Sequence, residues 1–266
     1  MLLTYARLGA LRWVLLTILS LVAIFLILPV LFMVALSFGS SQWLAFPPPS
    51  LTLHWYRAFF EDPRWLASIW TSTKIGILVT ILSTSLGLMA SFALVRGRFR
   101  GREFLRAAFL TPMILPVVIV AVAVYAFFLR LGLSGTLTGF VIAHTVLALP
   151  FAIIPISNAL AAFDTAIEDA AIVCGASPWE ARLRITLPSI RSGLYAAMIF
   201  SFLISWDEVV VAIFMASPTL QTLPVRMWTS LRQDLSPVIA VASSLLIFFT
   251  LAMMLLAAFL RRTKTQ

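Results

Sequence analysis

The sequence predicts an all-α membrane protein with six transmembrane helices and one structured cytoplasmic loop. Hydrophobic residues make up 62% of its 266 residues and charged residues only 11%, a balance typical of multi-span membrane proteins. Six mainly apolar stretches are each long enough to cross a bilayer, which takes about 20 helical residues. Arginines gather at the ends of these stretches, which fits the positive-inside pattern and explains the net charge of +9 without nucleic-acid binding.

The first span is expected at residues 13–36, after a short basic start that contains Arg7 and Arg12. No convincing small-x-small cleavage site follows it, so we expect an uncleaved helix with a cytoplasmic N-terminus. An outer loop should follow, with a stiff Pro47-Pro48-Pro49 run and a short interfacial helix near residues 51–60, anchored by aromatic side chains. The sequence is therefore divided into a first helix with its outer loop (1–66), a core (67–260) and a basic tail (261–266).

The other five spans are expected at residues 68–95, 104–131, 137–161, 189–215 and 238–260. Pro112 and Pro116 fall inside one of them, and Pro150 and Pro155 in the next, where they should kink the helix. Membrane helices tolerate proline where neighbours satisfy the freed carbonyls, so we expect each stretch to remain one span. Residues 216–237 should return on the outer side. Both termini are then cytoplasmic, and the Arg-rich run at 96–102 marks a cytoplasmic loop.

The cytoplasmic loop at residues 164–188 predicts two short helices around a turn. Small and apolar residues recur at three- and four-residue spacing in its first half, which indicates one helical face. Gly175 can end this helix at a positive φ. Ser177, Pro178 and Glu180 form an S-x-x-E capping box with proline at the first helical position, which predicts the start of the second helix. Pro188 is expected to end that helix and begin the next span.

The same loop resembles the cytoplasmic signature loop of ATP-binding-cassette (ABC) importer permeases. That pattern is E-A-A, three residues, G, nine residues, then I-x-L-P, and an acid is kept here at its first position, where Asp169 follows Glu168. The resemblance implies a type I importer permease fold, with a coupling helix that docks on a separate ATPase subunit. The residues that it assigns to coupling are Glu168, Asp169, Ala170, Ala171, Gly175, Ala176, Ser177, Pro178, Ile185, Leu187 and Pro188.

Asp207 and Glu208 are the only acids inside any predicted span, and buried charges in a membrane are functional candidates by default. Asp207 should lie about 27 Å along its helix, in the outer half. Adjacent helical residues point about 100° apart, so one acid could face a cavity and the other a neighbouring helix. Trp206 offers a face for cation–π contact with an ammonium group. A structural pair bridging to Arg226, Arg232 or a partner subunit is the alternative.

Two polar residues in the expected helix at 137–161 are further pathway candidates. Intramembrane polar groups usually face the interior of a helix bundle, which applies to both His144 and Asn158. His144 could make a packing hydrogen bond or serve the pathway. The sequence around the two acids also resembles spermidine/putrescine-type permeases, a subgroup that includes carriers of iron, opines and amino-phosphonates. This implies a permease for a small solute, with a polyamine cation as the first expectation and those solutes as the alternative.

The resemblance also implies partners. These are a sister permease, in a heterodimer, two ATP-binding subunits and a periplasmic substrate-binding protein, all at a bacterial inner membrane. The chain has no G-x-x-x-x-G-K-[ST] motif, so ATP and Mg²⁺ are expected on the partner ATPase and no cofactor or catalytic residue in this chain. There is no H-E-x-x-H motif and one cysteine, Cys174, so neither a metal site nor an intramembrane enzyme is expected. A passive channel, the other alternative, would not need such a structured loop.

Overall fold

The computed structural model describes residues 11–233 and 236–262, and this part of the chain is helical with no β-strand. The α-helices are α1 (Leu11–Ser37), α2 (His54–Glu61), α3 (Pro63–Arg96), α4 (Arg102–Ile114), α5 (Val117–Arg130), α6 (Leu137–Ala161), α7 (Thr165–Val173), α8 (Pro178–Ala181), α9 (Leu187–Ser189), α10 (Arg191–Trp206), α11 (Val210–Met215), α12 (Leu223–Gln233) and α13 (Val238–Arg262). A π-helix, η2 (Arg182–Thr186), lies between α8 and α9. The predicted all-α class is confirmed.

Four of these helices are long and apolar enough to cross a membrane, namely α1, α3, α6 and α13. Two bent pairs pass the same test together, α4 with α5 and the α8–α9 segment with α10. The described residues therefore supply up to six spans, as the sequence predicted. Arg7 and most of the basic tail, residues 263–266, lie outside the described residues.

The chain divides into two compact units, the first of which holds residues 1–62 and 230–249. Within it, α1 is followed by an irregular segment and by α2, the short helix expected near residues 51–60. The Ser37 hydroxyl lies 2.9 Å from the Tyr56 hydroxyl, and the Thr52 N–H donates to the Phe38 carbonyl at 2.7 Å. These bonds join the end of α1 to the start of α2.

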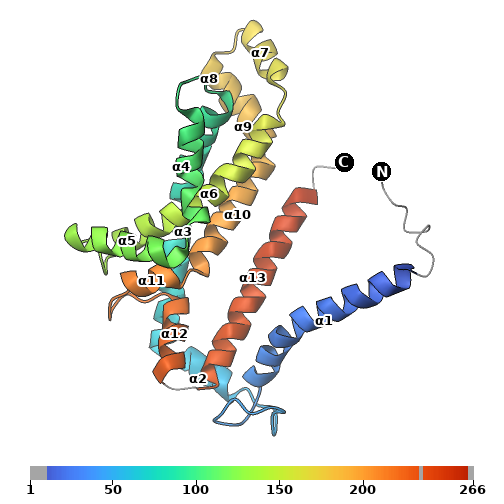
Figure 1. The fold of residues 1–266 in the computed structure, drawn as a ribbon, viewed down its shortest axis with the longest axis vertical. Helices are drawn as coiled ribbons and strands as arrows, with labels where there is room; N and C mark the ends of the chain where they lie inside the picture. The colour runs from blue at the N-terminus through green and yellow to red at the C-terminus, as the bar shows by residue number, and fades with distance from the viewer. Residues whose placement is uncertain (1–10, 234–235, 263–266) are drawn as a thin grey trace. The chain divides into compact units, whose positions relative to one another are not determined.

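The second unit holds residues 63–229 and 250–266, and its core is a packed trio of α3, α6 and α10 (Figure 1). Small residues bring these helices close together. A Cβ on Gly87 of α3 would lie 2.8 Å from the Ala152 Cβ of α6, and one on Gly193 of α10 would lie 2.6 Å from the Ala159 Cβ. The trio leaves no room for an added methyl group at either contact. Helix α6 continues unbroken through Pro150 and Pro155.

The predicted span at 104–131 is not one continuous helix, because α4 and α5 meet at 104° (Figure 1). The break falls at Leu115, whose φ of −71° and ψ of 145° are extended. Proline disfavours the helical conformation of the residue before it and supplies no N–H, and Pro116 follows Leu115 directly. Pro112, by contrast, is accommodated inside α4.

The predicted span at 189–215 is also broken. The α8–α9 segment meets α10 at 69°, at Ile190, and Pro188 lies inside α9 instead of ending a helix. Helix α10 then ends at Trp206, with Asp207 as its C-cap, and α11 begins at Val210. The two acids therefore occupy a helix break, not the interior of a span. Residues 223–233, expected as outer loop, form α12.

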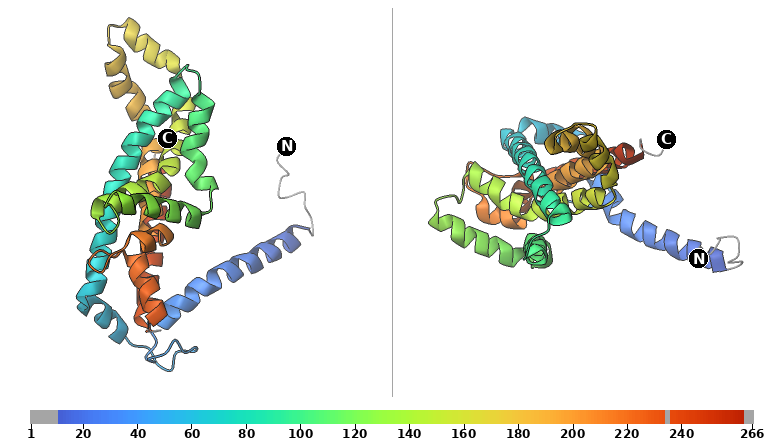
Figure 2. Two further views of the ribbon diagram at one scale, coloured as in Figure 1. Left: turned by 60° about the vertical axis from the view of Figure 1, so that its left-hand side comes forward. Right: turned by 90° about the horizontal axis from the view of Figure 1, so that it is seen from above.

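The loop at 164–188 has the two short helices that the sequence predicts, beyond the ends of α6 and α10 (Figure 2, left). Asp164 caps α7 by accepting from the Ala166 N–H at 3.0 Å. Gly175 has a φ of 97°, and the Ala176 N–H donates to the Ala171 carbonyl, which is the bond of a Schellman motif. The capping box between Ser177 and Glu180 is present, with Pro178 at the start of α8.

Candidate functional site

A cavity of about 430 Å³ lies where two helix breaks of the second unit come together. Pro112, Leu115 and Val117 contribute from the α4–α5 break, and Asp207 and Glu208 from the α10–α11 break. Leu147 and Phe151 of α6 complete much of the apolar wall. We call this the acidic cavity. It is mainly apolar with two carboxyl groups, a composition suited to a small solute that carries positive charge and methylene groups.

The two acids have different surroundings. Glu208 turns its carboxylate onto the start of α11, where Oε1 accepts from the N–H groups of Val210 and Val211 at 2.9 Å each, and Oε2 accepts from Ala212 at 2.8 Å. These are N–H groups that a helix start leaves without intrahelical partners, and a negative charge there is favourable. Glu208 is 8% exposed at its side chain, whereas Asp207 is exposed. Glu208 is thus committed to the protein's own backbone.

His144 supports the same break from α6. Its ring is fully buried, and Nδ1 lies 3.0 Å from the Ser205 Oγ of α10. Nε2 lies 3.7 Å from the Glu208 Oε2 and has no hydrogen-bond partner within the described residues. The packing hydrogen bond considered for His144 is therefore present, and it links α6 to α10 beside Glu208.

Trp206, the ammonium contact suggested by the sequence, lies in the protein interior. The residue is 5% exposed, and its ring stacks on Phe202 with centroids 5.5 Å apart and planes 20° from parallel. Phe202 thus covers one face of the ring, the kind of surface that a cation would use. Trp206 packs within α10 in this structure, whereas the pathway candidates Asp207 and Asn158 are exposed.

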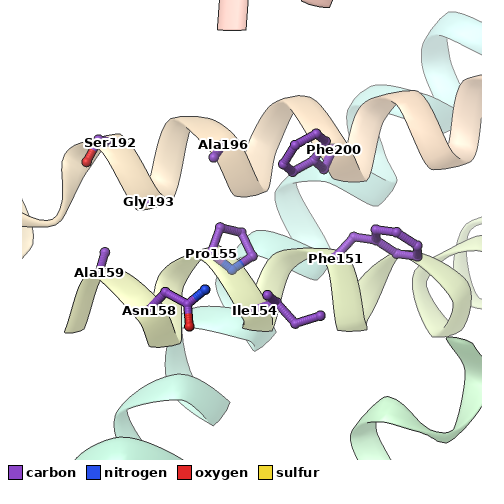
Figure 3. Close-up of a pocket in the computed structure, with 9 residues that line it drawn as sticks. All are labelled: Phe151, Ile154, Pro155, Asn158, Ala159, Ser192, Gly193, Ala196 and Phe200. Atoms are coloured by element: carbon purple, nitrogen blue, oxygen red, sulfur yellow. The ribbon is translucent and has the colours of Figure 1, made fainter. Parts of the chain in front are cut away.

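A second cavity of about 560 Å³ continues along α6 and α10 toward the loop, and we call it the α6–α10 groove (Figure 3). Asn158 and Ser192 contribute polar groups to it, beside Pro155, Ala196 and Phe200. Phe151 lines both this groove and the acidic cavity. The structure therefore separates the sequence candidates, with the acids in one cavity, Asn158 in the next and His144 buried between helices.

In the loop, the acid that makes contacts inside the chain is Glu168, whereas Asp169 is exposed. Glu168 contacts Arg96, Arg182 and Thr186, and the sequence does not indicate any of these three contacts. In the sequence Arg96 indicates only membrane topology, and Thr186 is the unspecified residue of the I-x-L-P motif.

Glu180 shows the electrostatics of the second loop helix, outside the apolar spans. Its pKa is lowered from the ordinary value of 4.5, first because the Ser177 N–H donates to the carboxylate, and then because of the Ser177 hydroxyl and the charge of Arg184. The ionised form is the one that completes the capping box, so the second loop helix begins most firmly when Glu180 is charged. No group of three or more metal-ligating side chains occurs among the described residues.

Comparison with known proteins gives one family match and several similar chains. The family model described as binding-protein-dependent transport system inner membrane component matches residues 83–265. The spermidine/putrescine transport system permease protein PotC of Escherichia coli (strain K12) is 26% identical over 246 residues, which is 91% of each chain. The putrescine transport system permease protein PotI of the same organism is 30% identical over 231 residues, 84% of this chain and 82% of that one.

A solved structure shares the fold. It is a bacterial ABC transporter involved in the import of the acidic polysaccharide alginate, with a TM-score of 0.72, 18% sequence identity and coverage of 98% of each chain. At that identity the similarity supports the helical architecture alone. The helical architecture of this chain is thus one seen in an experimental structure.

Proposed function

This chain belongs to the binding-protein-dependent transport system inner membrane components, and from that premise we propose that it forms half of the path by which an ATP-driven importer carries a polyamine-like cation. It is an ABC importer permease of a bacterial inner membrane, crossing the bilayer several times. The observation that carries the substrate class is the acidic cavity, in which an exposed Asp207 lies among apolar side chains.

A polyamine matches this cavity because it alternates ammonium groups with methylene chains. The aspartate attracts the ammonium groups, and the apolar residues around it can pack against the methylene groups. PotC is named as a spermidine/putrescine permease and PotI as a putrescine permease, which supports the same substrate class for this chain. We assign the substrate contact to Asp207, since the carboxylate of Glu208 is already used by three backbone N–H groups.

A single carboxylate makes a weak binding site for the cation, which suits a transporter. The cation must leave the cavity after it enters, and a single exposed acid holds it less firmly than a closed cluster of acids would. From the acidic cavity the solute would pass Phe151 into the α6–α10 groove, where Asn158 and Ser192 can replace water at the ammonium groups. Selectivity would then reside mainly in the binding protein that delivers the solute.

The assembly we propose has four kinds of subunit. A sister permease would close the open side of the groove, two ATPase subunits would dock on the loops at 164–188 of the two permeases, and a periplasmic binding protein would bring the solute. ATP and Mg²⁺ would bind to the ATPase subunits, so that this chain has no hydrolytic role. We place the loop and both termini in the cytoplasm, following the distribution of arginine.

Uptake measurements test this function. The complete importer, with its binding protein, is reconstituted in liposomes loaded with ATP, and radiolabelled putrescine and spermidine are supplied outside. We expect ATP-dependent uptake, and Asp207→Asn should lower it several-fold with unchanged complex yield, because the amide removes the charge and keeps the shape. Glu103→Gln is the matched control, since Glu103 is 68% exposed at its side chain and, among the described residues, pairs with its close neighbours Arg102 and Arg106.

Two results would count against the proposal. Uptake of an iron complex, an opine or an amino-phosphonate without any polyamine uptake would replace the substrate and leave the importer standing. Uptake that proceeds equally with and without ATP would indicate a passive channel instead.

A further inference from the structure

The loop at 164–188 is joined by the chain to α6 on one side and to α10 on the other, but α3 can reach it only through space. Helix α3 nevertheless packs against both α6 and α10 and completes the trio that forms the core of the second unit. A movement of the loop would pull directly on two helices of this trio. The movement can reach α3, the third helix of the trio, only through a side-chain contact.

Glu168 holds the two halves of the loop together. It lies in α7 with only 13% of its side chain exposed, and its Oε2 accepts from the Thr186 hydroxyl at 2.8 Å. The Arg182 Nε lies 3.5 Å from Oε1. Arg182 and Thr186 are the first and last residues of η2, and Thr186 is fully buried. One carboxylate thus ties α7 to both ends of the π-helix.

Arg96 brings α3 to the same carboxylate. It is the last residue of α3, and its Nη2 lies 4.0 Å from the Glu168 Oε2. This nitrogen is buried and has no hydrogen-bond partner within the described residues. The guanidinium carbon also lies 5.7 Å from the ring centroid of Phe163, in the link between α6 and α7. Arg96 is therefore held between an aromatic face and a carboxylate, and both belong to the base of the loop.

The π-helix makes this cluster more than a surface ion pair. The Leu187 N–H donates to the Arg182 carbonyl five residues earlier, so the turn contains one more residue than an α-helical turn. A single π-turn interrupts the regular hydrogen bonding of an α-helix, and such turns are frequent at functional sites. Here the irregular turn contains Arg182 and Thr186, the two η2 residues that contact Glu168.

We propose that Glu168 is a positioning residue that fastens the cytoplasmic loop to α3 through Arg96, so that the loop and α3 move as one body when an ATPase moves the loop. The proposal rests on the proposed function, since it takes the loop as the part an ATPase drives. From α3 the motion reaches the two cavities, because Gly87 abuts Ala152 of α6 and a Cβ on Gly76 would lie 2.9 Å from the Phe202 ring of α10. Contacts this tight leave no slack to absorb a shift.

Coupling efficiency tests the link. Glu168→Gln keeps an oxygen that can accept from Thr186 but removes the charge that faces Arg96 and Arg182, and Arg96→Gln removes the charge from the other side. We expect both variants to retain ATPase subunits and ATP hydrolysis in the purified complex, while putrescine carried per ATP hydrolysed falls on the order of tenfold. Glu103→Gln, the same chemical change at an exposed cytoplasmic acid, should leave this ratio unchanged.

The outcomes separate this proposal from the importer assignment. A wild-type complex that lacks ATPase subunits would overturn the proposed function and this inference with it. A functional wild type whose ratio survives both substitutions would overturn the inference alone. If Glu168→Gln fails to assemble, Arg96→Gln decides, since it leaves every residue of the loop intact. Loss of ATPase binding in both variants would assign the cluster to docking and overturn its role in transmission.

A distance measurement checks the rigid body without reference to the substrate. Spin labels are placed at exposed Thr165 of α7 and at Met89 of α3, which is 70% exposed, with Cys174 replaced by serine. The distance between the labels should be the same in nucleotide-free and ATP–vanadate-trapped complexes of the wild type. It should change between the two states when Glu168→Gln is added. A change of distance in the wild type would overturn the proposal.

Discussion

Asp207 and Glu208 are neighbours in the chain, yet one carboxylate faces a cavity and the other closes the start of a helix. Three backbone N–H groups of α11 donate to Glu208 at 2.8–2.9 Å. Glu208→Gln keeps one oxygen but loses the charge and turns an NH₂ group toward donors. We expect it to lower stability by about 1–2 kcal/mol, in the range of a lost helix cap. Thermal unfolding of the detergent-solubilised complex measures the change.

Asp207→Asn is the control for that experiment, because Asp207 caps no helix start among the described residues. Its unfolding temperature should stay close to that of the wild type while its uptake falls. The reverse pattern, with a stable Glu208→Gln and an unstable Asp207→Asn, would contradict the assignment of the two acids.

A second residue-scale prediction concerns pH at Glu180. Its folded-state pKa is lowered, so the ionised carboxylate stabilises the helix start above the ordinary value of 4.5, and this contribution is lost as the pH falls through the lowered pKa. Glu180→Ala should speed hydrogen exchange at the amides of residue 177 and residues 179–181 at neutral pH. The difference from wild type should shrink below pH 4.5. An equal difference at both pH values would show that the charge of Glu180 is not involved.

At the scale of single elements, local signals predicted the loop closely and the broken spans poorly. The caps at Asp164, Ser177 and Glu180 depend on residues within a few positions, so the sequence contains what decides them. Whether a proline breaks a membrane helix depends on neighbouring helices that satisfy the freed carbonyls. Pro150 and Pro155 stay inside α6, whereas Pro116 breaks the expected span. No local pattern separates the two cases.

Gly175 offers an element-scale prediction. Its φ is 97°, which costs a β-branched residue about 1–2 kcal/mol, although a Cβ there would meet nothing within 4 Å. Gly175→Val should therefore disturb the end of α7 and reduce the recovery of ATPase subunits with the permease. Gly101→Val is the matched control, since Gly101 has a φ of 90°, an equally open surrounding and a place outside the loop. Equal ATPase recovery from the two variants would argue against a docking role for the turn.

At the scale of the whole molecule, thiol labelling tests the orientation. Cys174 is the natural reporter, because it is exposed on the loop. In intact cells an impermeant thiol reagent should not reach it, and opening the membrane should make it react. In a Cys174→Ser background, Thr219→Cys should react from outside; Thr219 is exposed in the turn before α12. Labelling of Cys174 in intact cells would reverse the proposed orientation.

The cavities are the part of the site that could not be predicted from the sequence. Residues near 115, 150 and 205 line the acidic cavity together, and they meet only because two breaks face each other across the same helix. The sequence identified Asp207 and Glu208 from the cost of charge in a membrane, which is a local property. Their division of roles came from geometry, since neither residue type nor spacing tells which acid turns back onto its own backbone.

The bend between α4 and α5 has a consequence for how the protein inserts into the membrane as it is synthesised. Thirteen and fourteen helical residues extend only about 20 Å each, less than the roughly 30 Å hydrocarbon layer, so neither helix crosses a bilayer alone. Together they are apolar enough to be read as one segment by the insertion machinery. The segment would enter straight and fold over afterwards, once α6 and the α10–α11 break exist to receive it. Maturation would then include a late step that waits for the last third of the chain to be synthesised.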